Sequence, residues 1–271
     1  MSVIKLIMSD IDGTILDQNH QLDSHLLELM PLLKQSEIPF VLASARSPLG
    51  IAPISKELGI TDFPIASYNG ALIGTGDKIL SQHTINKKEL LLLHDFLTKE
   101  FPTVSINVYS GKYWYVNTLD KWVEIEAQIT GESPKVTSLA DFLQEEKNLI
   151  HKLLLIDNAA TIQKLKETLA TMDFPQTDFY LSKDNYLEVT HNQVSKKQAL
   201  LELANYYQLS LTEIMSIGDN YNDIPMIETA GLGVAMGNAP DEVKAVADFV
   251  TDTNVNGGVA KAIWRVLEQE K

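Results

Sequence analysis

The sequence predicts a doubly wound α/β fold, a parallel sheet with helices on both faces, into which a second α+β domain is inserted. Two observations predict this fold. Short apolar runs alternate with segments of helical periodicity at both ends of the chain. Between residues 83 and 187 this alternation stops, and strand-like runs follow one another directly. We therefore expect a core domain formed by 1–82 and 188–271, interrupted by an α+β domain over 83–187.

The N-terminal alternation begins with an apolar run at 3–8, which is too short for a helix and is typical of a buried parallel strand. Leucines at helical spacing follow at 24–35. Pro31 within this segment lacks a backbone N–H, so it predicts a kink or a later start of the helix. The alternation then continues with a strand, a helix and a strand, at 39–43, 49–58 and 64–67.

The middle section mixes helices with adjacent strands. The expected helices are 86–100 and 160–172. The expected strands are 104–109, 113–117, 152–156 and a pair around 183–185. Such mixing is typical of a sheet with one covered face.

From residue 194 onward the strand–helix alternation returns. The expected helices are 196–207, 224–230, 240–247 and 258–269, and the expected strands are 214–217, 233–236 and 249–251. In sheets of this class ligands bind beyond the carboxyl ends of the strands. Asp10, Asp12, Ser44 and Asn69 all follow predicted strands, so this edge of the sheet is the expected site.

The composition limits the class of partner. The chain has 271 residues with 22 Lys and Arg against 36 Asp and Glu, a formal net charge of −14. Nucleic acids and anionic membranes select basic surfaces, so neither is expected as a partner. The absence of cysteine excludes disulfides, zinc–thiolate sites and a cysteine nucleophile. No segment resembles a secretory signal or reaches the roughly 18 apolar residues of a membrane span, so we expect a cytoplasmic protein.

Two aspartates follow the first predicted strand. Asp10 and Asp12 are two residues apart in an extended run, so both carboxylates leave the same side of the chain. Their repulsion is relieved by a bound cation or a shared proton. An acidic turn after an edge strand fits this pair equally well. An EF-hand calcium loop does not, because its glycine stands at position 6, whereas Gly13 directly follows Asp12.

A second acidic group follows the predicted strand 214–217. Asp219 and Asp223 are four residues apart and share one face if the loop enters a helical turn. Carboxylate oxygens without a nearby His or Cys suit Mg²⁺. Asp223 is also placed to cap the helix that begins near Ile224, and this role is compatible with a metal site.

Cationic and hydroxyl side chains complete a candidate anion site. Ser44 and Arg46 follow the strand 39–43, and Lys196 opens the helix 196–207. A cation at a helix N-terminus is unfavourable unless it serves an anion, which favours a functional role for Lys196. A solvated surface charge is the alternative.

The order of these motifs resembles the haloacid dehalogenase (HAD) superfamily, and more closely its Cof-type phosphatases with an α/β cap. The resemblance spans the whole chain. The matching segments are 10–14, Ser44, 67–71, Lys196, 218–223 and 236–239. The fold that it implies is a Rossmann-like core, with 83–187 as a cap domain that sets substrate specificity.

The resemblance implies a role for each matched residue. Asp10 is the nucleophile that forms an aspartyl-phosphate, and Asp12 is the acid for the leaving alkoxide and then the base for water. The implied Mg²⁺ ligands are Asp10, Asp12 through its backbone carbonyl, Asp219, and Asp223 directly or in the outer shell. The residues implied to bind the phosphoryl oxygens are Ile11, Ser44, Ala45, Arg46, Lys196 and Asn222.

The implied activity is that of a Mg²⁺-dependent phosphatase for small phosphorylated metabolites, either sugar phosphates or phosphorylated cofactors. Two alternatives remain, a sugar phosphomutase with the same aspartyl-phosphate and a non-catalytic phospho-ligand sensor. The expected partner is a small-molecule phosphate ester, and the expected assembly is a monomer or a homodimer.

Some positions depart from the family pattern. Ser44-Ala45 stands where Thr-Gly is common, and Gln193 and Lys197 stand where Gly is common. Residues 113–115 and His83 could face substrate, although aromatic residues in a strand more often pack within the sheet. The other histidines have no metal-ligand spacing.

Overall fold

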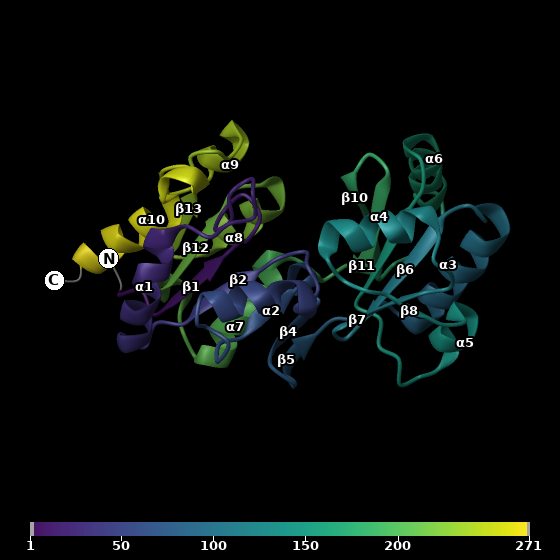
Figure 1. The fold of residues 1–271 in the computed structure, drawn as a ribbon, viewed down its shortest axis with the longest axis horizontal. Helices are drawn as coiled ribbons and strands as arrows, with labels where there is room; N and C mark the ends of the chain where they lie inside the picture. Colours follow the sequence, from purple (N-terminus) through teal and green to yellow (C-terminus); the bar gives the residue numbers. More distant parts are fainter. Residues whose placement is uncertain (1–2, 270–271) are drawn as a thin grey trace. The chain divides into compact units, whose positions relative to one another are not determined.

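The computed structural model describes residues 3–269, which divide into two compact units (Figure 1). The first unit contains the chain up to Arg46, Ile51–Ser81, and the chain from Ser195 onward. The second unit contains Ser47–Gly50 and Gln82–Val194.

The inserted segment ends later than the sequence predicts. The expected boundary at residue 187 falls inside strand β11 (Tyr186–His191), which pairs with β9 (Lys152–Ile156) of the second unit. Residues 188–194 therefore belong to the second unit and not to the core.

The first unit is built on an eight-stranded sheet with the order β14-β13-β12-β1-β2-β3-β4-β5. The strands from β14 through β3 run parallel, and β4 is antiparallel to β3. The bounds are β1 Leu6–Ser9, β2 Phe40–Ala43, β3 Ile65–Ser67, β4 Leu72–Thr75, β5 Lys78–Gln82, β12 Ile214–Gly218, β13 Leu232–Ala235 and β14 Phe249–Val250. The prediction of a doubly wound α/β fold is confirmed. Strands β4 and β5, at one edge of the sheet, were not predicted.

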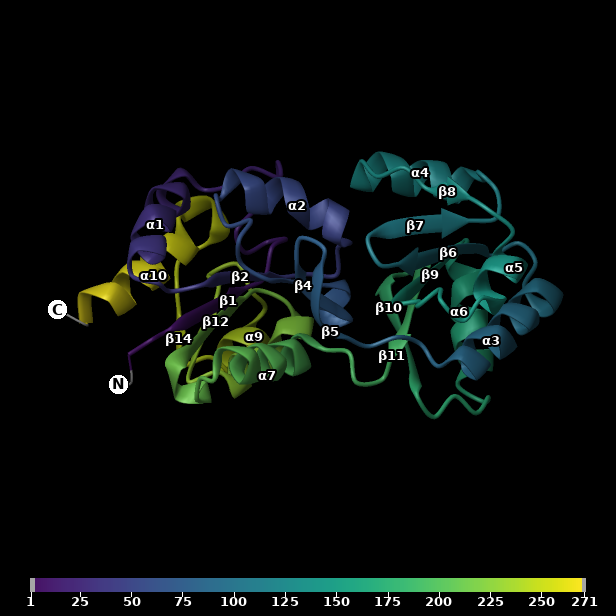
Figure 2. The same cartoon turned by 90° about the horizontal axis from the view of Figure 1, so that it is seen from below.

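Helices cover both faces of this sheet because its strands are apolar on both sides. In β1, Ile7 packs in a cluster with α1, α2 and α10, whereas Leu6 and Met8 pack in a cluster with α7, α8 and α9. Figure 2 shows the first group of helices on one side of the sheet and α7 and α9 on the other. The bounds are α1 Ser24–Gln35, α2 Pro48–Glu57, α7 Lys196–Tyr207, α8 Ile224–Thr229, α9 Asp241–Ala245 and α10 Gly258–Gln269.

The second unit is a six-stranded sheet with the order β10-β11-β9-β6-β7-β8. One face packs against α3, α5 and α6, which supply leucines and isoleucines to a separate core (Figure 2). The remaining strands are β6 Ser105–Ser110, β7 Tyr113–Val116, β8 Lys135–Val136 and β10 Thr177–Lys183. The helices are α3 Lys87–Glu100, α4 Lys121–Thr130, α5 Leu139–Gln144 and α6 Ala159–Leu169. The α+β character expected of the insertion is present.

Three local differences from the predicted elements have clear causes. Pro31 lies inside α1, which still begins at Ser24 because Asp23 caps its N-terminus. Helix α4 was missed, although Asp120 caps its start and Gly131, at φ 70°, ends it. Helix α5 was missed because it has only 6 residues. Among the described residues, none of the helices combines the length and the apolar character needed to cross a membrane.

Candidate active site

The predicted site residues of the first unit lie at the carboxyl edge of its parallel sheet. Asp10 follows β1, Ser44 follows β2 and Asp219 follows β12. Because β1 pairs in parallel with both β2 and β12, the ends of these three strands are neighbours. The backbone N–H of Asp10 donates to the carbonyl of Ile217 at 2.9 Å, which fixes the nucleophile candidate against the second acidic motif.

Three carboxylates converge at this edge. Asp10, Asp219 and Asp223 each offer an oxygen, and these oxygens lie within 4.8 Å of one another. Asp223 is fully buried, Asp10 is 6% exposed and Asp219 is half-buried. An all-oxygen, anionic donor set of this kind fits a hard divalent cation such as Mg²⁺ and does not fit a soft metal. Elsewhere in residues 3–269 no comparable group of three forms.

Lys196 is the cation of this cluster. It is the first residue of α7, whose N-cap Ser195 accepts a hydrogen bond from the backbone N–H of Gln198. Its Nζ forms ion pairs with Asp10 and, at 2.5 Å, with Asp223, and its side chain is only 1% exposed. The surface-charge alternative for Lys196 is therefore wrong, and this lysine serves buried anions at a helix N-terminus.

Burial dominates the protonation of the cluster. It raises the pKa of Asp10 to about 8, an effect opposed by the charge of Lys196 and reinforced by Asp223 and Asp219. Burial also raises the pKa of Asp219 to about 6, and the charge of Asp223 adds to that shift. Burial lowers the pKa of Lys196, but the charges of Asp10 and Asp223 outweigh it and the net shift is upward. One lysine does not compensate three carboxylates, and this excess of negative charge favours a bound cation.

Asp223 has both carboxylate oxygens engaged. Oδ2 accepts the backbone N–H groups of Asp219 and Asn220, each at 3.0 Å, and Oδ1 accepts from Lys196. The side chain makes no capping bond to α8, although the sequence allowed that role. It turns instead toward the backbone of the loop that precedes α8. A Cβ on Gly218 would lie 2.5 Å from the Asp223 Cγ, so glycine is required for this approach. Asp223 thus fixes the loop and the lysine together.

Asp219 is oriented by side chains from two other loops. Thr14 Oγ1 donates to Asp219 Oδ1 at 3.1 Å, and Asn238 Nδ2 donates to Oδ2 at 3.3 Å. Asn238 Nδ2 also donates to the Gly13 carbonyl at 2.9 Å. Gly13 has φ 83°, and a Cβ there would lie 2.3 Å from Asp219 Oδ2. Asn238 belongs to the matched segment 236–239, but no role was predicted for it, although its place shortly after β13 was a usable signal.

The side chain of Asp12 lies outside the acidic cluster. Arg46 Nε donates to Asp12 Oδ2 at 2.8 Å, and an Arg46 terminal nitrogen donates to Oδ1 at 2.5 Å. The Asp12 side chain is 47% exposed and that of Arg46 is 30% exposed. Two aspartates two residues apart thus have different environments, since Asp10 is buried beside a lysine and Asp12 is accessible and held by an arginine.

Backbone and amide groups border this edge as well. Ser44 is buried, its Oγ accepts the backbone N–H of Arg46 at 3.2 Å, and its carbonyl accepts that of Asn69 at 2.7 Å. Asn222 Nδ2 donates to Asn69 Oδ1 at 3.4 Å. Ile11 is buried, and its carbonyl accepts the N–H groups of the turn that follows. The structure therefore brings the residues of all four motifs to one edge, and a phosphoryl contact of Ile11, Ser44, Ala45, Arg46 or Asn222 stays a prediction.

The aromatic residues noted in the second unit mostly pack within it. Trp114 is 2% exposed, donates from Nε1 to Asn107 Oδ1 at 3.0 Å and stacks on Tyr109. Tyr115 packs against Phe142, with ring centroids 4.2 Å apart. The packing interpretation holds for these two residues.

Comparisons with known proteins agree with this geometry. A model of the haloacid dehalogenase-like hydrolase family matches residues 7–263. A protein of Haemophilus influenzae is 34% identical over 258 residues, which cover 94% of this chain and 95% of that protein. A 5-amino-6-(5-phospho-D-ribitylamino)uracil phosphatase of Bacillus subtilis is 25% identical over 265 residues, which cover 96% of this chain and 94% of that protein. The crystal structure of a haloacid dehalogenase-like hydrolase from Bacteroides thetaiotaomicron superposes with a TM-score of 0.88 and 30% identity, covering 97% of this chain and 99% of that one. From its sequence and its fold, the chain belongs to the haloacid dehalogenase-like hydrolase family.

Proposed function

We propose that this protein is a Mg²⁺-dependent phosphatase that hydrolyses small phosphorylated metabolites through a covalent intermediate on Asp10. One observation carries the proposal. Asp10 is buried between Lys196 and two further carboxylates, whereas Asp12, two residues on, is accessible and bound by Arg46. This contrast suits a nucleophile that needs a compensated charge and an acid/base that must reach a leaving group.

In the first step, an Asp10 carboxylate oxygen attacks the phosphorus and the bond from phosphorus to the ester oxygen breaks. Protonated Asp12 gives its proton to the leaving alkoxide. In the second step, Asp12 takes a proton from water as that water attacks the phosphorus of the aspartyl-phosphate. The bond from Asp10 to phosphorus then breaks, which restores the Asp10 carboxylate and releases inorganic phosphate. Asp12 ends protonated, ready for the next ester.

The acidic cluster supports a divalent cation in this scheme. Asp10, Asp219, Asp223 and the Asp12 backbone carbonyl are the proposed ligands, and the cation would neutralise charge as the anionic nucleophile meets an anionic ester. Because both oxygens of Asp223 already accept hydrogen bonds, we assign it mainly to holding Lys196 and the Asp219 loop. Lys196 supplies a positive charge beside the oxygen that attacks.

The remaining polar groups at this edge are proposed to bind the phosphoryl oxygens. These are the Ser44 hydroxyl, the backbone N–H groups of Ile11 and Ala45, the Asn222 amide, Lys196 and Arg46. Donors already fixed by the fold stabilise developing charge without reorganisation during the reaction. The second unit is proposed to act as a cap that selects the rest of the substrate.

The proposed substrates are sugar phosphates or phosphorylated cofactors. The named relative from Bacillus subtilis acts, by its name, on a phosphorylated ribityl compound, which is an ester of this class. The net charge of −14 supports a small substrate over a polyanion, and the absence of cysteine suits a reducing compartment such as the cytoplasm. We propose a monomer or a homodimer.

The test is hydrolysis of p-nitrophenyl phosphate with and without Mg²⁺, followed by a panel of phosphorylated metabolites. Asp10→Asn is expected to abolish phosphate release while its circular dichroism spectrum stays that of the wild type. Asp62→Asn, at an exposed aspartate, is the matched control and is expected to keep full activity. Rapid acid quenching during turnover is expected to add one phosphoryl group to the peptide that contains Asp10.

Different outcomes separate the alternatives. Substantial turnover by Asp10→Asn contradicts the nucleophile assignment. An isomeric sugar phosphate in place of free phosphate indicates a phosphomutase. Stabilisation by phosphate esters without any phosphate release indicates a sensor.

A further inference from the structure

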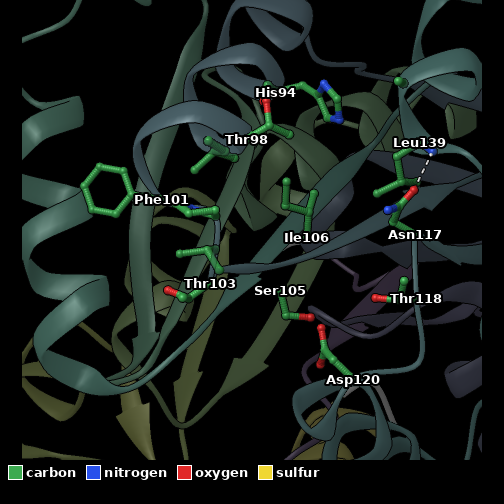
Figure 3. A pocket seen from close by; sticks show the side chains of 14 residues that line it. His94, Thr98, Phe101, Thr103, Ser105, Ile106, Asn117, Thr118, Asp120 and Leu139 are labelled. Atoms are coloured by element: carbon green, nitrogen blue, oxygen red, sulfur yellow. Dashed lines mark hydrogen bonds between the residues drawn. The ribbon is translucent and has the colours of Figure 1, made fainter.

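The second unit contains a cavity of about 470 Å³ that none of the proposed chemistry uses. It lies among the C-terminal half of α3, the start of β6, the segment before α4 and the first turn of α5 (Figure 3). All fourteen residues that line it belong to the second unit, whereas the acidic cluster belongs to the first. A ligand in this cavity therefore has its own set of contacts.

The floor of the cavity is apolar. Val104, Ile106 and Val108 point to the same face of the sheet, toward α3 and α5, because alternate residues of a strand share a face. Val104 and Val108 are buried, but Ile106 between them is only half-buried. Leu97 of α3 and Leu139 of α5 line the same cavity as Ile106. Helices α3 and α5 thus leave a gap over Ile106, and the cavity is that gap.

The border of the cavity is rich in hydroxyl groups. Thr98, Thr103, Ser105 and Thr118 all line it. In the view of Figure 3, the side-chain oxygens of Ser105 and Thr118 lie at the same end as those of Asp120. Thr98 and Thr103 already donate to acceptors of the protein, so their oxygens are left to accept hydrogen bonds from a ligand that carries hydroxyl groups.

Asp120 is the acidic residue of the lining, and one of its two carboxylate oxygens can still accept hydrogen bonds. Its Oδ1 accepts the backbone N–H groups of Trp122 and Val123, at 2.8 and 3.0 Å, and so caps α4. Within residues 3–269, no donor bonds to its Oδ2. Asp120 lines the cavity, and its side chain is held in place by the two bonds to Oδ1, so the carboxylate is a preorganised acceptor for hydroxyl donors.

The charges of the lining exclude a phosphorylated ligand. Among the described residues that line the cavity there is no Lys or Arg, and Asp120 supplies a negative charge. The start of α4 is already occupied by the Asp120 carboxylate, and the start of α5 by the Ser138 hydroxyl, which accepts from Asp141. Neither helix terminus is left open for an anion.

We propose that this cavity binds a small uncharged polyhydroxy compound, a sugar or polyol, with its apolar face on Ile106 and Leu97 and its hydroxyl groups toward Asp120 Oδ2. The residues of this site are not among those proposed to bind phosphate, and the inference does not depend on the function proposed above. Its ligand differs from the proposed substrates in lacking the phosphate group. The full protein thus takes an ester at one site and a neutral polyol at the other.

The test is a titration of the full ¹⁵N-labelled protein with D-glucose and with ribitol at millimolar concentrations, followed by amide resonances. Saturable shifts are expected at Ile106, Thr118 and Asp120 with at least one of these probes. D-glucose 6-phosphate, added to Asp10→Asn protein to prevent hydrolysis, is expected to leave these three resonances in place.

Two variants locate the binding. Asp120→Asn removes the carboxylate but keeps a residue that caps a helix N-terminus about as well as Asp does. It is expected to weaken polyol binding about tenfold. Ile106→Trp is expected to fill the cavity and abolish binding. Ile129→Trp, at an exposed isoleucine of α4 outside the cavity, is the matched control and is expected to bind as the wild type does.

Three results overturn the proposal. The first is the absence of saturable shifts with either neutral probe, and the second is binding that survives both Ile106→Trp and Asp120→Asn. The third is an equal response of these resonances to the phosphorylated sugar. If Ile106→Trp does not fold, Asp120→Asn alone decides where the polyol binds.

Discussion

Replacing Lys196 by Met is the most direct perturbation of the buried charge cluster. The change keeps the length and much of the apolar stem of the side chain but removes its positive charge. Asp10 and Asp223, whose side chains are 9% and 0% exposed, then lose their shared counter-ion. The variant therefore contains two carboxylates at close range with no compensating charge of the protein.

The expected loss of stability follows from the geometry. Two unit charges about 4 Å apart interact by about 4 kcal/mol at an effective dielectric constant of about 20. Lys196 makes two contacts that are shorter than 4 Å, and the cost of burying the lysine offsets part of their sum. Removing one partner of a buried pair typically costs about 3–5 kcal/mol. Because Asp10, whose pKa is already raised to about 8, can take up a proton, we expect a loss near the lower end of that range.

The assay is urea denaturation in the presence of EDTA, followed by circular dichroism. Lys197→Met, at the exposed neighbouring lysine, is the matched control and is expected to change the free energy of unfolding by less than about 0.5 kcal/mol. Adding Mg²⁺ is expected to recover part of the loss in Lys196→Met, because a cation that binds only the folded protein stabilises it.

The pH dependence of the loss has a defined sign. Without Lys196 the folded-state pKa values of the carboxyl groups lie further above their unfolded values. Groups shifted in this direction destabilise the fold at high pH, and the penalty disappears as the pH falls below the unfolded pKa near 4. The difference between variant and wild type should therefore shrink on acidification from pH 7. A loss below about 1 kcal/mol, or one that is constant with pH, refutes the reasoning.

Three further predictions concern other contacts. Gly13→Ala places a methyl group 2.3 Å from Asp219 Oδ2 at φ 83°, and it should lower Mg²⁺ affinity, measured by calorimetry, and stability by about 1–2 kcal/mol. Arg46→Met frees the Asp12 carboxylate and should lower kcat on the order of a hundredfold, with a smaller change in KM, in steady-state assays. His151 is 2% exposed, its Nδ1 accepts the Gly111 N–H, and burial lowers its pKa from 6.5 to about 4. Acidification from pH 6.5 to 4 protonates this histidine mainly in the unfolded chain, so its contribution to the free energy of unfolding, taken as the difference between wild type and His151→Gln in urea titrations, should fall by about 3 kcal/mol over that interval.

Each of these predictions has a control. Gly59→Ala also adds a methyl group at positive φ, 70°, but meets no atom within 4 Å, so an equal loss of Mg²⁺ affinity there contradicts the clash. Arg46→Lys keeps the charge without the bidentate geometry and should fall between Arg46→Met and the wild type. An unchanged kcat in Arg46→Met removes the positioning role. His151→Gln should flatten the acid-dependent loss, whereas His25→Gln, at an exposed histidine, should not.

The predictable part of the site follows from one rule of parallel sheets. The carboxyl ends of neighbouring parallel strands meet at one edge, so any side chain directly after such a strand is placed near the others. On this basis Asp10, Asp12, Ser44 and Asn69 were expected at one edge, and the structure pairs β1, which Asp10 follows, in parallel with β2, which Ser44 follows. The charge argument about helix N-termini favoured a functional role for Lys196, because a cation at that position is unfavourable unless it serves an anion.

The contacts that were not predicted depend on side-chain rotamers and on the order of strands that are far apart in the sequence. Arg46 follows Asp12 by 34 residues, and only the rotamer of the arginine brings it to this carboxylate. Asn238 bonds to Gly13 across 225 residues, which requires the position of β13 in the sheet as well as its existence. Strands β4 and β5 and helix α4 were also not predicted, although α4 is as amphipathic as α1 and its sequence therefore carried the signal.

The inserted unit lies, along the chain, between two groups of residues of the candidate active site, so the ribosome makes one group before the unit and the other after it. Asp10 and Ser44 precede Gln82–Val194, whereas Lys196, Asp219 and Asp223 follow it. Strand β1 has β12 as a neighbour, and β12 begins only at Ile214. On a ribosome, the inserted unit is therefore complete, with its own apolar core, while β1 still has an open edge and Asp10 lacks its lysine. We expect the inserted unit to fold first, and Asp10 to remain without its counter-ion until nearly three-quarters of the chain has been made.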